Sequence, residues 1–236
     1  AHPALPNTGW LQAWTTASAD ALVPGGSVVN MAVVPADAED LRERVASCGS
    51  SSVWTDQPGA NEQRAINCVN FFEAFLYCVW DDGRLPTEAE WNAAAAGGGE
   101  QRAYPWSMPP QSLTINATHA AYNRTESSPS FEVGQFPAGR GRWNTHDLAG
   151  NVYEWVRDTG SVATIDSYVD GASNPVSLVD DSNPSTRHFL RGGSFKSLPR
   201  PGSSEPVALR TSARALLSPM ARLNDVGIRC ARFQAP

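Results

Sequence analysis

The sequence predicts a single α+β domain with much irregular backbone. Helical patterns come early in the chain and short strand-like stretches follow in its second half, which is typical of segregated α+β folds. The 19 glycines and 18 prolines are spread along the chain instead of gathering in one linker, so turns should interrupt regular structure throughout. A length of 236 residues suits one large domain, 1–236.

Two segments in the first third repeat apolar side chains at helical spacing. Residues 36–45 are charged and helix-prone, with apolar side chains four positions apart. Residues 69–80 (VNFFEAFLYCVW) predict a stronger helix, whose broad buried stripe ends at Val79 and Trp80. The rest of residues 1–60 gives few signals.

A third helix has clear signals at both ends. Thr87 is followed three residues later by Glu90, the pattern of a capping box. The helix should run through four alanines and end at the glycines 97–99. Glu88 and Glu90 could be interpreted as paired carboxylates for acid–base catalysis, but the capping box accounts for them without catalysis.

The remainder of the chain predicts loops joined by short strands. Residues 104–144 are mostly loop. We expect short strands at 131–133, 152–157, 188–195, 207–215 and 226–233.

Composition excludes some classes of function. Lys and Arg number 18 against 24 Asp and Glu, a net charge of −6, which argues against a nucleic-acid-binding surface or an anionic-membrane anchor. No apolar run approaches the roughly 20 residues of a membrane span. Hydrophobic residues make up 41% of the chain and include eight tryptophans, which indicates a packed globule.

The four cysteines are Cys48, Cys68, Cys78 and Cys230. No Cys-x-x-Cys pair and no neighbouring histidine gives them the spacing of a zinc site. Buried free thiols are one interpretation. Two disulfides are the other, with three possible pairings, and they would imply an oxidising compartment.

Four separated strings resemble one known family. They are RLPTEAEW at 84–91, GNVYEW at 150–155, RGGSF at 191–195 and VGIRCA at 226–231. In order, spacing and chemistry they resemble the formylglycine-generating enzyme, or sulfatase-modifying factor, family from about residue 66 to 232. The resemblance implies the C-type-lectin-like version of an α+β fold.

The resemblance also implies a disulfide pairing. The family joins the cysteine of the helix at 69–80 to the cysteine of the last string, which here are Cys78 and Cys230. Cys48 would then pair with Cys68.

A calcium site is implied at the second string. The ligands carried over are the side chains of Asp147 and Glu154 and the carbonyls of Gly150 and Val152, an all-oxygen set of the kind that calcium prefers. The alternative is a turn whose carboxylates accept from backbone amides. A second family calcium site would begin at Asn116, although its other ligands do not align.

The chain departs from the family where the oxidative chemistry occurs. The enzymes bind copper through two thiolates after the Gly-Gly-Ser string, and the aligned residues here are Ser197 and Gly202. A hydroxyl is a poor ligand for monovalent copper, and glycine has no side-chain ligand. Tyr153 replaces the tryptophan of the family's oxygen pocket, whereas Ser194 is retained. We therefore expect neither copper nor the formylglycine-generating reaction.

A related branch uses an iron bound by three histidines. The histidines of this chain are His2, His119, His146 and His188. They are scattered and show no His-x-x-x-His spacing, so an iron site of that kind is not expected.

The segment 196–224 departs most from the enzymes. It is rich in Ser, Pro and Arg and brings Arg200, Arg210, Arg214 and Arg222 into an acidic protein. Because it lies where the family has its active-site groove, it indicates a ligand-binding groove. A solvated loop with ordinary surface charge is the alternative.

The sequence thus favours a non-catalytic, secreted or periplasmic recognition domain. It would bind a peptide, a glycan or a protein through a groove lined by Tyr153, Ser194, Ser197, Arg200 and Arg210. One alternative is a family oxidoreductase that works without the cysteine pair. Another is a structural subunit completed by a second chain, since the N-terminal part of the family domain is not recognised in the sequence and its first strand would need a substitute.

Overall fold

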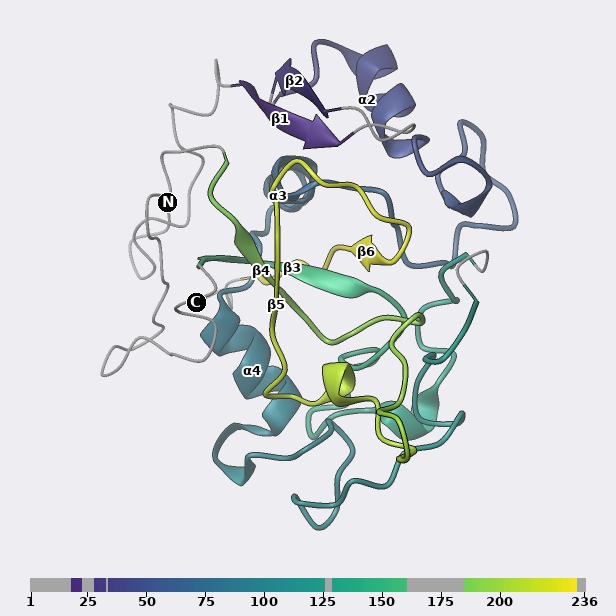
Figure 1. Cartoon of the computed structure of the whole chain (residues 1–236), viewed down its shortest axis with the longest axis vertical. Coiled ribbons are helices and arrows are strands. Elements are labelled where there is room, and N and C mark those ends of the chain that lie inside the picture. Colours follow the sequence, from purple (N-terminus) through teal and green to yellow (C-terminus); the bar gives the residue numbers. More distant parts are fainter. Residues whose placement is uncertain (1–17, 23–27, 33, 126–128, 161–184, 233–236) are drawn as a thin grey trace.

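The computed structural model describes residues 18–22, 28–32, 34–125, 129–160 and 185–232 (Figure 1). The helices are α2 (Ala38–Val45), α3 (Phe71–Trp80) and α4 (Glu88–Ala96). A central sheet is made of β3 (Tyr153–Thr159), β4 (His188–Arg191), β5 (Ala215–Leu217) and β6 (Val226–Gly227). The predicted α+β class with much coil is confirmed.

The central sheet is mixed, with strand order β5-β4-β3-β6. β3 pairs antiparallel with β4, which pairs antiparallel with β5. On its other side β3 pairs in parallel with β6, placing Tyr153 opposite Val226. β3 is therefore the strand on which the two halves of the sheet depend.

A separate hairpin was not predicted. β1 (Ser18–Leu22) and β2 (Val28–Ala32) form an antiparallel two-stranded sheet, which lies beside α2 in Figure 1. The sequence predicted no regular structure for these residues. The signal that could have revealed the hairpin is the string Pro24-Gly25-Gly26 between two apolar runs.

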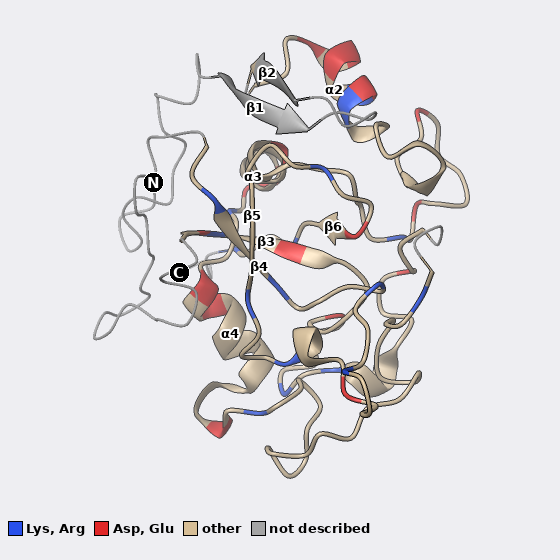
Figure 2. Cartoon of the chain, viewed as in Figure 1, with Lys and Arg blue, Asp and Glu red and all other residues tan. Residues whose placement is uncertain are grey.

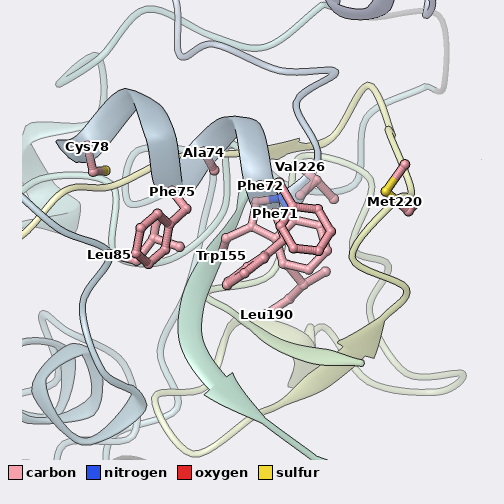
Figure 3. Close-up of a cluster of buried hydrophobic side chains, with 10 residues drawn as sticks. All are labelled: Phe71, Phe72, Ala74, Phe75, Cys78, Leu85, Trp155, Leu190, Met220 and Val226. Atoms are coloured by element: carbon pink, nitrogen blue, oxygen red, sulfur yellow. The ribbon is translucent and has the colours of Figure 1, made fainter. Parts of the chain in front are cut away.

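Helix α3 is the main apolar support of the sheet. Asn70 accepts from the backbone of Glu73, whose side chain accepts from the backbone of Asn70, a full capping box. The first turns of the helix pack on Trp155, Leu190 and their neighbours (Figure 3). This cluster of buried side chains is Phe71, Phe72, Ala74, Phe75, Cys78, Leu85, Trp155, Leu190, Met220 and Val226.

The predicted buried stripe of α3 was wrong at its end. Val79 is 49% exposed and Trp80 is 79% exposed. Cys78 takes the inward position instead, because its disulfide to Cys230 turns that face of the last turn toward the C-terminal segment. Tyr77, 49% exposed, shares the outer surface with Trp80.

Helix α4 begins and ends as predicted. The Thr87–Glu90 capping box is present, and Gly97 ends the helix with φ +72°. Glu88 has a different role from the one expected. Its buried carboxylate lies 2.5 Å from Nε of Arg214 and 3.5 Å from Arg191, so it anchors α4 to the sheet by ion pairs.

The predicted strand limits were partly wrong. Residues 207–209 form a 3₁₀ turn, and only the end of the expected strand pairs, as β5. Residues 131–133 contribute a single bridge between Glu132 and Arg64. β6 is two residues long, and a Cβ on Gly227 would collide with the carbonyl oxygen of Ile66. These limits are set by segments distant in sequence.

Both predicted disulfides form. Cys48 pairs with Cys68 and Cys78 pairs with Cys230, with Cα atoms 6.0 and 5.4 Å apart. The pairings join residues 20 and 152 positions apart in the sequence. The second bond ties α3 to the segment after β6 and so closes the domain.

We predict that the two disulfides contribute unequally to stability. Loop entropy makes the Cys78–Cys230 bond worth about 2 kcal/mol more than the Cys48–Cys68 bond, each lying in the range of about 2–5 kcal/mol. Cys78→Ser/Cys230→Ser and Cys48→Ser/Cys68→Ser should therefore differ in urea unfolding, with the first pair the less stable. Equal midpoints and slopes would contradict the entropic argument.

Candidate functional site

The family strings converge on one buried contact. Trp91 Nε1 donates to Glu154 Oε2 at 2.6 Å, and the Arg229 guanidinium donates to both oxygens of the same carboxylate at 2.7–3.0 Å. The Arg191 guanidinium lies over the Trp91 ring, 4.8 Å from its centroid. A Cβ on Gly192 would lie 3.2 Å from that ring. Each of the four strings supplies a residue to this contact.

The turn after β4 presents Ser194. Gly193 has φ +68°, and a Cβ there would lie 2.6 Å from Leu209 and 2.9 Å from the carbonyl oxygen of Ala208. Only glycine therefore allows this turn to pack against the 3₁₀ turn that precedes β5. Ser194 is fixed directly beyond it and is buried.

Ser194 belongs to a small polar cluster. Its hydroxyl donates to Asp225 Oδ2 at 2.7 Å, and its backbone N–H donates to Ser197 Oγ at 2.9 Å. Lys196 Nζ lies 3.8 Å from the other oxygen of Asp225. Burial raises the pKa of the Tyr153 hydroxyl. A hydrogen bond with Ser197 lowers this pKa, but by less than burial raises it.

The structure thus brings Tyr153, Ser194 and Ser197 together. That they line a ligand-binding groove stays a prediction. Lys196 and Asp225 were missed as members of the cluster. The position of Asp225 directly before the last family string was the signal that could have identified it. The cluster is made of hydroxyl, amine and carboxylate groups, which hydrogen-bond one another.

No thiol is available beside this cluster. All four cysteines of the chain are held in disulfides. Ser197 is half-buried, and Gly202 lies exposed with open space around its Cα. A copper ion bound by two thiolates does not fit these residues.

The four arginines of the predicted groove have two kinds of surroundings. Arg200 and Arg210 lie on or beside an exposed loop, and the side chains of the other two are buried. The loop from Leu198 to Ser204 faces solvent over most of its length and carries Arg200, whose backbone N–H donates to the carbonyl of Glu205 at 3.0 Å. Arg210 is half-buried and forms an ion pair with Glu205. Burial raises the pKa of the nearby Tyr104 hydroxyl to about 12.

The other two arginines are not ligand-facing, contrary to expectation. Arg214 is buried against Glu88 and lies over the Phe189 ring, 5.4 Å from its centroid. Arg222 forms a buried ion pair with Glu73 of α3. Both side chains hold helices to the rest of the domain, because each finds a buried carboxylate that the sequence did not reveal.

The loop from Asp147 to Glu154 is tightly wound. Asp147 and Gly150 have φ +57° and +78°. Asp147 Oδ2 accepts from the backbone N–H of Gly134 at 2.7 Å. Burial raises the pKa of the Asp147 carboxyl, and the neighbouring Glu154 carboxylate raises it further.

These residues fit a calcium site only in part. The two carboxylates and the carbonyls of Gly150 and Val152 are oxygen donors of the kind that calcium binds. Glu154, however, already accepts from Trp91 and Arg229, so ligation by Glu154 requires it to share its oxygens. Calcium in this loop stays a prediction.

Asn116 occupies a local turn. Its Oδ1 accepts from the backbone N–H and the hydroxyl of Thr118 at 2.9 and 2.7 Å, and it lies 3.0 Å from Nδ1 of His119. These contacts satisfy the turn by themselves. The second calcium site expected at Asn116 also stays a prediction.

The described histidines have separate surroundings. His119 stacks on Trp106 with ring centroids 4.9 Å apart, and His188 stacks on Phe71 at 3.5 Å. His146 packs beside Gly134, and His2 lies outside the described residues. Within the described part of the chain, no three His, Cys, Asp or Glu side chains form a group that could hold a metal ion. No helix in that part combines the length and apolar character needed to cross a membrane.

The comparisons with known proteins agree with the four strings. The family model described as the sulfatase-modifying factor enzyme 1-like domain matches residues 20–234. The formylglycine-generating enzyme of Thermomonospora curvata is 30% identical over 197 residues, which cover 78% of this chain and 59% of that enzyme. The Streptomyces coelicolor enzyme is 29% identical over 232 residues, covering 88% of this chain and 68% of that enzyme.

One mouse relative carries a different description. It is called inactive C-alpha-formylglycine-generating enzyme 2, and is 31% identical over 127 residues, covering 52% of this chain and 40% of the mouse protein. This chain thus spans about 40–68% of the length of these three relatives.

Two solved structures share the fold. PvdO from Pseudomonas aeruginosa matches with a TM-score of 0.55 at 17% identity, covering 90% of this chain and 89% of PvdO. Variable protein 1 of Treponema denticola matches with a TM-score of 0.50 at 20% identity, covering 91% of both chains. At these identities the likeness concerns the fold alone. With 215 of its residues inside the family match, the chain belongs to the sulfatase-modifying factor, or formylglycine-generating enzyme, family.

Proposed function

We propose that this chain is a non-catalytic recognition domain on the formylglycine-generating enzyme scaffold. The observation that carries the proposal is that every cysteine is used in a disulfide. The resemblance assigns Ser197 and Gly202 to the copper-ligand positions, so no thiol is left to bind copper. The residues that hold the scaffold together, such as Trp91 and Glu154, are kept. The mouse relative described as inactive supports the existence of family members without the activity.

The recognition surface would lie around the Ser194 cluster and the loop that follows it. Arg200 and Leu198 project from this loop, and Leu198 is 67% exposed. Tyr153 and Lys196 are half-buried. Such a surface would suit a peptide, glycan or protein partner with an acidic group that Arg200 can pair with.

The two disulfides support a secreted or periplasmic location. Disulfides that stabilise a fold persist in oxidising compartments and are rare where thiol reductants are abundant. The location stays part of the proposal.

A second candidate function is oxidation without the cysteine pair. Hercynine oxygenase of Mycobacterium tuberculosis is 31% identical over 172 residues, covering 70% of this chain and 36% of that protein. Iron or copper bound tightly at one equivalent per chain, found by elemental analysis of the purified protein, would favour this candidate over recognition.

We predict no formylglycine-generating activity, even in the presence of copper. The two thiolates that the reaction needs are replaced by Ser197 and Gly202. The assay is conversion of the cysteine in a sulfatase-type peptide to an aldehyde, followed by mass spectrometry, with the Thermomonospora curvata enzyme as the positive control. Turnover by this chain would show that the active site lies elsewhere.

For the recognition surface, we predict that Arg200→Ala weakens binding of a captured partner at least about fivefold, the effect of losing about 1 kcal/mol. The fold should be unchanged, because only the backbone of Arg200 makes a described hydrogen bond within the domain. Arg210→Ala is a poorer test, since it removes the ion-pair partner of Glu205.

The matched control is Arg232→Ala, which removes an exposed arginine that pairs with Asp81 and lies outside the proposed surface. Partners are captured with the wild-type domain and measured by surface plasmon resonance. Equal losses in the two variants, or none in either, would remove the support for this surface.

Calcium at the loop from Asp147 to Glu154 is part of the same proposal. If calcium binds only the native state, chelation should lower the melting temperature by about 5–10 °C, given saturating calcium at first. Asp147→Ala should abolish that dependence, whereas Asp56→Ala, an exposed control, should keep it. Melting curves that do not respond to chelator would exclude a stabilising calcium ion.

A further inference from the structure

A large groove lies outside the segment 196–224. It has a volume of about 980 Å³ and is bounded by α2, the loop after it, α3 and the segment 228–230. Asp147, Val152 and Glu154, three of the proposed calcium ligands, also line it. None of its lining residues comes from 196–224. A pocket of this volume is large enough to take several side chains of a ligand.

The lining of the groove is mostly apolar in area. Its larger apolar side chains are Leu41, Val45, Val53, Trp54, Pro58, Ile66, Val69, Tyr77, Val133, Val152 and Ile228. An apolar lining favours apolar side chains of a ligand.

Four large side chains at the groove stay exposed although they are apolar. Leu41 is 40%, Trp54 43%, Tyr77 49% and Val133 63% exposed. They come from four different segments of the chain, yet all line the same groove. Exposed apolar side chains scattered singly are ordinary, but their gathering at one groove marks a docking surface.

More acidic than basic side chains line the groove. The acidic ones are Asp56, Glu62, Glu73, Asp81, Asp147 and Glu154, and the basic ones are Arg42, Arg64 and Arg229. Acidic and basic residues lie close together on α2 (Figure 2), and its charged residue at the groove is Arg42. Two of the arginines are already paired within the domain: Arg42 lies 3.4 Å from Asp56, and Arg229 lies 2.7 Å from Glu154. Glu62 is exposed, and the hydrogen bond described for its side chain is a long one of 3.4 Å from the backbone N–H of Gly59.

The walls are held in place before any ligand arrives. The side chain of Asn67 accepts from the backbone N–H of Val53 at 3.0 Å and donates to the carbonyls of Ser51 and Asn224 at 2.8 and 2.7 Å. The Cys48–Cys68 disulfide closes the same loop. A preformed groove binds without the cost of ordering its own walls.

We propose that this groove docks a short segment of a partner protein that carries apolar side chains flanked by lysine or arginine. The apolar side chains would lie against Trp54 and Tyr77, and the basic ones would face the exposed Glu62 and the other carboxylates that line the groove. The complementary charge selects this occupant, because a second copy of the acidic chain would bring like charge to the mouth. The inference does not rest on the proposed function.

The test starts from a displayed library of random linear peptides selected against the whole chain. Enriched sequences should combine apolar residues with Lys or Arg. An enriched peptide, synthesised with a fluorophore, is then titrated by anisotropy. Trp54→Ala and Tyr77→Ala should each weaken its binding at least tenfold, and Glu62→Lys at least threefold.

Controls separate this groove from the rest of the surface. Trp143→Ala removes a tryptophan that is 53% exposed and does not line the groove, and it should leave the affinity unchanged. Arg200→Ala should also leave it unchanged, so failure of this proposal and failure of the recognition surface are told apart. The proposal is overturned if no peptide is enriched, if the enriched peptides are acidic, if Trp54→Ala binds as well as wild type, or if light scattering shows a dimer that Trp54→Ala dissociates.

Discussion

The rest of the structure depends on the hydrogen bonds that the buried carboxylate of Glu154 accepts. Glu154 stands in the central strand β3 and accepts from Trp91 of α4 and from Arg229 beyond β6. A carboxylate buried to this degree is tolerable only when its hydrogen-bonding capacity is filled. Removing one partner of such a pair costs about 3 kcal/mol or more, so Trp91 and Arg229 have to be present together with Glu154.

This contact explains why four short strings separated by long loops mark the fold. The four side chains that meet here come from different strings: Trp91, Glu154, Arg191 and Arg229. Each of them contacts a side chain from another string. The loops between the strings only have to return the chain to this point. Their sequences can therefore vary without altering the scaffold.

Local signals allowed some elements to be predicted from the sequence and not others. The capping box at Thr87 and the left-handed Gly97 depend on residues within one turn, so α4 was predicted at both ends. Strand limits depend on distant partners: β6 stops where Gly227 crosses the backbone of Ile66. The site shows the same division. Tyr153, Ser194 and Ser197 were identified from their strings, whereas the burial of Arg214 depends on Glu88, more than a hundred residues away.

The parallel pairing of β3 with β6 has a consequence for how the domain folds during synthesis. The apolar face of α3, with Phe71, Phe72 and Phe75, packs on a sheet whose last strand comes about 150 residues later. Contacts of such high sequence separation form slowly, and this face stays open while the chain between them is made. A nascent chain in that state exposes an aggregation-prone aromatic surface and unpaired strand edges. Until the C-terminal third has been made, this face is therefore the part of the domain most exposed to aggregation.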